Sequence, residues 1–297
     1  MNAKLKNNGM LMLTALIWGS AFVAQSVGMD YIGPFTFNSV RCLLGGLVLL
    51  PLIWSMEKKR GEDIGDRPAE NKKLLWAGGV SCGIALGIAS SLQQVGILYT
   101  SAGKAGFITA LYILIVPVLG VFLGNRAGIR IWIGVGLATA GMYFLCIKEG
   151  FSISKGDFLV VLCAVIFSLH ILMIDYFSPK VDGVKMSCIQ FFVSGILCAV
   201  PMCIVEKPSA DAILGAYLPL LYAGILSCGV AYTLQIIAQK NTNPTVASLI
   251  LSLESVFAVL TGWLVLHETL TAREILGCAL VFGAIILAQL PEKASVS

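Results

Sequence analysis

Apolar residues dominate ten successive stretches of the chain, and polar residues gather in the segments between them. Each stretch is roughly 20 residues long, enough for a helix to cross about 30 Å of hydrocarbon. The pattern therefore predicts an all-α integral membrane protein with ten transmembrane helices. The predicted spans cover residues 9–28, 32–55, 74–99, 103–124, 130–147, 156–177, 184–205, 213–239, 244–266 and 272–290.

Lysine and arginine are unevenly distributed over the segments between these spans. Because cytoplasmic segments carry an excess of both residues, the distribution predicts a multi-pass protein of the cell (inner or plasma) membrane with both termini in the cytoplasm. The inner segments then hold Lys4, Lys6, Lys58, Lys59, Arg60, Arg67, Lys72, Lys73, Arg126, Arg130, Lys180, Lys185, Lys240 and Lys293, and the outer ones hold Lys104, Lys148, Lys155, Lys207 and Arg273. The net charge of +4 follows from this topology and calls for no nucleic-acid partner.

The second half of the chain repeats the first. Residues from Ser91 onward align with residues from Thr233 onward, matching Leu92 with Leu234, Gln93 with Gln235, Thr100 with Thr242, Ala105 with Ala247, Ile108 with Ile250, Leu111 with Leu253 and Gly120 with Gly262; in a looser match of earlier spans, Arg41 falls over Gln190. Five spans per copy is an odd number, so the second copy enters the bilayer inverted, as in many secondary transporters. We therefore expect two inverted five-helix repeats, residues 1–148 and 149–297.

The segments between spans agree with an inversion. The polar segment 57–73 is expected in the cytoplasm. The basic segment 125–130 follows the fourth span, whereas its counterpart 267–271 contains His267 and Glu268. Opposite sides of the membrane explain this difference in charge.

Composition excludes several classes of protein. Hydrophobic residues make up 58% of the chain, charged residues make up 12%, and the mean hydropathy is +0.89. So few charged residues could not cover a water-exposed surface.

The nine cysteines lie within predicted spans without a CxxC pair and are expected to be small apolar fillers. No Walker A or HExxH sequence occurs, so we expect no ATP hydrolysis, no enzyme activity, no cofactor and no metal. A lipid-modifying membrane enzyme and a non-transporting scaffold remain as alternatives.

Three ionisable residues inside the spans are candidates for function, because such groups are costly in a bilayer. Glu254 lies about ten residues, or roughly 15 Å, after Pro244 and hence near the midplane; it is expected either to bind substrate or a proton, or to be a structural partner. Arg41 is expected to pair with Glu254, to reach the outer interface, or to act in coupling. His170 carries an imidazole, which titrates near neutral pH, and either relays protons or is held by a neighbouring carbonyl.

Neutral polar and aromatic residues form stripes on three spans. Trp18 and Gln25 share one face of the first span with Thr14, Gln93 and Gln94 lie on the third span with Ser90, and Tyr232 and Gln235 lie on the eighth with Gln239. Hydrogen bonding between helices explains such stripes as well as a substrate does. The candidate substrate-binding residues are Trp18, Gln25, Gln93, Gln94, Tyr112, His170, Tyr232, Gln235 and Glu254.

The chain resembles the EamA-type carriers of the drug/metabolite transporter superfamily. The resemblance rests on ALIWGSAFV in the first span, SVRCLLGGLVLLP in the second, LIVPVLG in the fourth, LSLESVFAVLTGWLVLHETLT from the ninth span onward, and the double five-helix layout. It implies a ten-helix bundle whose central cavity is lined largely by spans 1, 3, 4, 6, 8 and 9. Two departures are Asn125-Arg126, in place of an acidic end of the fourth span, and Ser255, where the family often has proline; the latter suggests a straighter ninth span.

These observations together predict a secondary-active or facilitative carrier in the lipid bilayer. It would move a small polar or amphipathic metabolite, such as an amino acid or drug-like compound, by alternating access, and the family resemblance favours export. A proton is a candidate coupling ion through Glu254 or His170. An importer of a vitamin or nucleobase-like compound is the alternative.

Overall fold

The computed structural model describes residues 3–62, 71–100, 102–124, 128–146, 154–266 and 271–289. All regular structure in these ranges is helical. The helices of the first half are α1 (Ala3–Gly28), α2 (Pro34–Glu62), α3 (Lys72–Ile97), α4 (Ala102–Thr109), α5 (Tyr112–Phe122) and α6 (Ile129–Cys146). Those of the second half are α7 (Lys155–Phe177), α8 (Gly183–Pro201), the π-helix η1 (Met202–Glu206), α9 (Ala210–Gly215), α10 (Tyr217–Leu221), the π-helix η2 (Tyr222–Tyr232), α11 (Thr233–Gln239), α12 (Pro244–Leu251), α13 (Leu253–Leu266) and α14 (Ala272–Gln289).

Each predicted span is helical, with ends close to those expected. Within the described residues, eight helical segments are long and apolar enough to cross a membrane, and two shorter apolar helices, Ile129–Phe144 and Ile275–Leu287, correspond to the fifth and tenth spans. Large apolar side chains face outward along the bundle; Phe122 is 83% exposed and Trp54 is 67% exposed. Such an extensive apolar surface is stable against lipid and not against water.

Local sequence sets several helix starts. Ser154 and Asp157 form a reciprocal capping box at the start of α7, which satisfies backbone N–H groups that lack helical partners. Asp182 accepts from two backbone N–H groups at the start of α8. Asn243 accepts from the Thr245 N–H at the start of α12, where Pro244 occupies the first turn.

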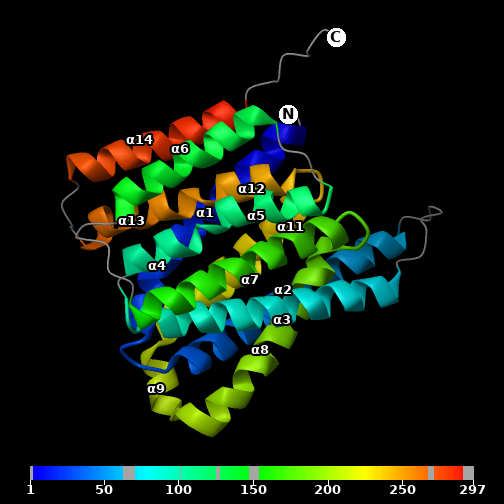
Figure 1. The fold of residues 1–297 in the computed structure, drawn as a ribbon. Coiled ribbons are helices and arrows are strands. Elements are labelled where there is room, and N and C mark those ends of the chain that lie inside the picture. Colours follow the sequence, from blue (N-terminus) through cyan, green and yellow to red (C-terminus); the bar gives the residue numbers. More distant parts are fainter. Residues whose placement is uncertain are drawn as a thin grey trace.

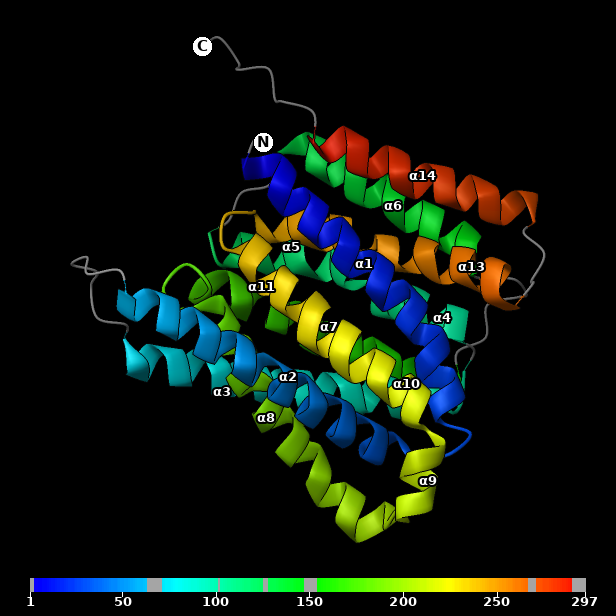
Figure 2. The same cartoon turned by 180° about the vertical axis from the view of Figure 1, so that it is seen from behind.

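Two pairs of corresponding helices, α2 with α8 and α6 with α14, run antiparallel. At one end of the α2–α8 pair, Lys185 Nζ lies 3.0 Å from Glu57 Oε1. At the other end, the carboxylate of Glu206 accepts from the Phe35 N–H at 2.9 Å and from the Thr36 N–H at 2.7 Å. Figures 1 and 2 show α6 and α14 paired along one edge of the bundle, with α8 and α9 at the opposite edge. The Arg273 guanidinium at the start of α14 lies over Tyr143 near the end of α6, so this pair is antiparallel as well.

The fourth helix of each half is interrupted at the same place. A turn at Ala110 and Leu111 separates α4 from α5, and a turn at Ser252 separates α12 from α13. Just after each break, a backbone N–H bonds to the carbonyl three residues earlier, from Ile113 to Ala110 and from Ser255 to Ser252. Ser255 follows the break at Ser252 by three residues, and a ninth span straighter than in relatives stays a prediction. Broken helices are common around transporter binding sites.

Three of the predicted segments between spans fall partly on residues that the structure does not describe. Residues 63–70 of the segment 57–73 and residues 267–270 of the segment 267–271 lie outside the described ranges, as do residues 125–127. Their sides of the membrane remain predictions.

Candidate functional site

A cavity lies where helices from both halves meet. It contains about 500 Å³ of space not occupied by atoms, including space open to solvent. Its lining consists of Trp18, Ala21, Phe22, Gln25, Arg41, Gln93, Thr109, Tyr112, Phe167, His170, Ile171, Ser227, Tyr232, Gln235 and Glu254. These residues come from all six spans that the resemblance assigns to the cavity, with Arg41 added from the second span.

The structure brings nearly all the predicted site residues together. The predicted residues on the lining are Trp18, Gln25, Arg41, Gln93, Tyr112, His170, Tyr232, Gln235 and Glu254. Gln94 is the exception, because its side chain donates to the backbone carbonyl of Gln25 at 3.3 Å and packs between helices. Consecutive residues point about 100° apart on a helix, so Gln93 faces the cavity and Gln94 does not.

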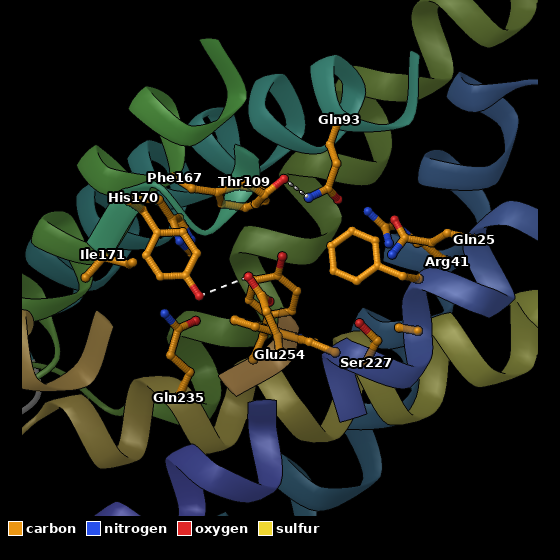
Figure 3. Close-up of a pocket in the computed structure, with 15 residues that line it drawn as sticks. Gln25, Arg41, Gln93, Thr109, Phe167, His170, Ile171, Ser227, Gln235 and Glu254 are labelled. Atoms are coloured by element: carbon orange, nitrogen blue, oxygen red, sulfur yellow. Dashed lines mark hydrogen bonds between the residues drawn. The ribbon is translucent and has the colours of Figure 1, made fainter. Parts of the chain in front are cut away.

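The polar stripes thus divide between packing and the cavity. Thr14 donates to the Ala231 carbonyl at 3.1 Å, and Gln239 donates to the Ile171 carbonyl at 3.3 Å. Both bonds join helices through backbone groups. Gln93 lines the cavity while its amide donates to Thr109 Oγ1 at 3.1 Å, as Figure 3 shows.

Aromatic rings form one part of the wall. The rings of Trp18 and Tyr232 lie 4.5 Å apart at 54°. Tyr232 also meets the His170 ring at 6.1 Å, nearly edge to face, and His170 meets Phe167 at 6.4 Å. Tilted and edge-to-face contacts are favourable geometries for aromatic pairs. This part of the wall suits a flat apolar group of a ligand.

Glu254 is held by a residue from the other half. The Tyr112 hydroxyl donates to Glu254 Oε1 at 3.0 Å, and Figure 3 shows this bond on the cavity lining. Tyr112 and Glu254 occupy equivalent positions in the two repeats. They are 142 residues apart, as are the matched residues Gln93 and Gln235. Each begins the half-helix that follows a break or lies within its first two residues. The two breaks therefore deliver a phenol and a carboxyl to one point between the repeats.

Arg41 does not pair with Glu254. Both residues are described, and no ion pair joins them; the Arg41 guanidinium instead lies 5.6 Å from the Phe37 ring centroid. Arg41 is 4% exposed and lies on the cavity lining. The expected reach to the outer interface is therefore not seen either, because the side chain turns inward from α2.

His170 has a side-chain partner. Its Nε2 lies 3.1 Å from Gln190 Oε1, so an amide oxygen takes the place of the expected neighbouring carbonyl. Gln190 is the repeat counterpart of Arg41. At this position the first half places the Arg41 guanidinium on the lining. The second half has Gln190, which contacts the His170 ring on the lining.

Several lining polar atoms have no partner among the described residues. They are Trp18 Nε1, Gln25 Oε1, Arg41 Nε and Gln235 Oε1. A buried polar atom without a hydrogen bond costs about 1–3 kcal/mol, so these atoms suit a bound ligand or water. In the described part of the chain, no group of three His, Cys, Asp or Glu residues is placed to hold a metal ion.

Six lining residues were not among the sequence candidates: Ala21, Phe22, Thr109, Phe167, Ile171 and Ser227. The repeat contained a usable signal for some of them. The register that places Arg41 over Gln190 also places Trp18 over Phe167 and Phe22 over Ile171. Thr109 and Ser227 carry no comparable signal, because short hydroxyl side chains are common throughout packed membrane helices.

Comparisons with known proteins agree with this architecture. The EamA-like transporter family matches residues 6–147 and again residues 154–290. An uncharacterized transporter of Archaeoglobus fulgidus is 34% identical over 94% of this chain and 84% of its own length. The uncharacterized inner membrane transporter YedA of Escherichia coli K12 is 23% identical over 95% and 90% of the two chains.

A solved crystal structure superposes with a TM-score of 0.78 over 95% of this chain and 96% of the other, at 18% identity, and thereby supports the fold alone. The family match covers both halves, and the relative from Archaeoglobus fulgidus extends over nearly the whole chain. This chain belongs to the EamA-like transporter family.

Proposed function

We propose that the protein is a secondary-active or facilitative carrier that moves a small polar or amphipathic metabolite outward by alternating access. The observation that carries the proposal is the cavity between the halves, with its aromatic wall and its unpartnered polar atoms. Residues 1–148 and 149–297 are the two inverted repeats that move against each other in this mechanism. Antiparallel counterpart helices and equivalent breaks support that division.

The charges of the lining limit the substrate. Among the described residues, Arg41 is the one guanidinium or ammonium group on the lining and Glu254 is the one carboxyl group. Such a site balances about one charge of each sign without a heavy desolvation cost. Neutral, zwitterionic or monovalent compounds are therefore the expected substrates, and amino acids and drug-like compounds are the first to test.

Transport is expected to run on gradients. Purified protein is first screened by thermal shift against amino acids, nucleobases and vitamins, because a ligand of the folded state stabilises it. In proteoliposomes without ATP, a stabilising compound should then move down its own gradient or with an imposed proton gradient. A strict ATP requirement, or a preference for sugar phosphates or nucleotides, would contradict the proposal. Transport rates measured with substrate gradients of opposite direction compare export with import.

The proposed orientation has both termini in the cytoplasm. Fusions of alkaline phosphatase, active only outside, and of a fluorescent protein, active only inside, are made within residues 57–73 and within residues 267–271. We expect the first segment to report the cytoplasm and the second the outside, since the basic residues follow that division. The same side for both segments is incompatible with inverted repeats.

A further inference from the structure

Arg41 is a buried cation without a carboxylate partner among the described residues. It is 4% exposed, lines the cavity from α2, and forms no ion pair with a described acidic side chain. Its Nε also lacks a hydrogen-bond partner there. The ring of Phe37, 5.6 Å from the guanidinium, provides a cation–π contact, which is weaker than a carboxylate partner.

The guanidinium of Arg41 has thiol and phenol neighbours. Cys42 hydrogen-bonds to Arg41, and Cys228 and Tyr232 lie close by. Gln25, which shares the cavity lining with Arg41, has a buried side-chain oxygen without a partner. Figure 3 draws Gln25 and Arg41 together at one side of the cavity, with Phe167 and His170 at the other. An amide can donate or accept, so it complements an ionic group bound by its neighbour.

A buried guanidinium is stabilised by an anion that pairs with it. Its planar fork matches a carboxylate through two parallel hydrogen bonds. We infer that Arg41 binds a carboxylate group of the substrate, with Gln25 beside it and the apolar part of the substrate against Trp18 and Tyr232. The inference rests on the proposed function, because it names the chemical group that the carrier selects.

A phosphate group fits this site less well than a carboxylate. A phosphate monoester carries nearly two negative charges at neutral pH, and the described lining offers a single guanidinium and no ammonium group. Glu254 adds a carboxyl to the same lining. The favoured class is therefore a monocarboxylate with a flat apolar body, whether or not it also carries an amine.

The test compares matched probes on the purified full-length protein. The probes are 3-phenylpropionate, its neutral amide 3-phenylpropanamide, and phenyl phosphate, and binding is read from the thermal shift. We expect the carboxylate to bind at least tenfold more tightly than the amide or the phosphate. Equal binding of carboxylate and amide, or no binding of the carboxylate, overturns the inference.

Variants assign the preference to the side chain. Arg41→Gln should abolish the preference for the carboxylate, and Arg41→Lys, which keeps the charge without the fork, should weaken it. Asn38→Ala is the matched control, since Asn38 is equally buried on α2 and has unpartnered side-chain atoms but lies off the lining; it should keep the preference. A preference that survives in Arg41→Gln also overturns the inference.

Stability separates binding from a structural role. Without ligand, Arg41→Gln should melt no lower than the wild type, because it removes a charge that lacks a carboxylate partner rather than half of an ion pair. A lower melting temperature in Arg41→Gln would show a structural partner and count against the inference; Arg41→Lys then still measures the carboxylate preference. If proteoliposomes transport substrates with and without a carboxylate equally well, the inference is refuted and the proposed carrier function stands. If no compound is transported along a gradient, the proposed function itself is refuted.

Discussion

Replacing Glu254 with glutamine is expected to reduce transport roughly 10- to 100-fold while the protein still folds. A hydrogen bond between the substrate and the charged Glu254 carboxylate would contribute about 1.5–3 kcal/mol. Its loss corresponds to this range in substrate affinity. Glutamine keeps an oxygen that can accept from the Tyr112 hydroxyl, now 3.0 Å from Glu254 Oε1, so the link between the two halves is preserved. If protons couple through this carboxyl, the pH dependence of transport should also disappear.

Tyr112→Phe is the matched control for the hydrogen bond. It removes the hydroxyl and leaves the carboxyl in place, so it is expected to cost about 1–3 kcal/mol of stability and to keep the pH dependence. Transport rates at several pH values and melting temperatures of both variants distinguish the two roles. Unchanged transport in Glu254→Gln would exclude this carboxyl from both substrate binding and coupling.

The helices could be predicted because lipid imposes a simple condition on the chain. A span must be apolar over roughly 20 residues and must satisfy its backbone internally, and both requirements are visible in the sequence. The breaks were not visible. Ala110 and Ser252 are ordinary helix residues in composition, and the interruption at each depends on how neighbouring helices pack around it.

The site could be predicted as far as depth and residue type determine it. Polar residues near the middle of a span are exceptional in lipid, which identified Gln93, Gln235 and Glu254 correctly as lining residues. The sequence does not determine which way a side chain points around its helix relative to the other spans. For this reason the sequence could not show that Gln94 lies off the cavity lining, and it left open whether Arg41 pairs with Glu254.

The repeat carried more information than its identities suggest. Matching residues by register, and not by type, relates Tyr112 to Glu254 and Trp18 to Phe167, and the structure brings all four to one cavity. Equivalent positions converge because inverted copies meet face to face across the bundle. A phenol and a carboxyl at such positions form the contact that two identical carboxyls could not form without repulsion.

Close packing of α1 on α13 gives the second large expected effect. A Cβ atom at Gly19 would lie 2.6 Å from the backbone oxygen of Glu254, 2.6 Å from Phe257 Cβ and 2.8 Å from the backbone nitrogen of Ala258. Two of these three atoms belong to the backbone, so the clash cannot be relieved by turning a side chain. Either α1 or α13 must move, and α13 carries Glu254.

Gly19→Ala is therefore expected to destabilise the protein by about 1–3 kcal/mol, the usual cost of overpacking, and Gly19→Leu by more. Transport should fall with stability, because displacement of α13 separates the Glu254 carboxyl from Tyr112. Gly9→Ala is the matched control on the same helix, since a Cβ atom at Gly9 meets nothing within 4 Å. This control should be neutral or stabilise the helix by up to about 1 kcal/mol. Thermal unfolding of the three variants in detergent measures the effect; a Gly19→Ala protein as stable as Gly9→Ala would show that the two helices pack less closely than this structure indicates.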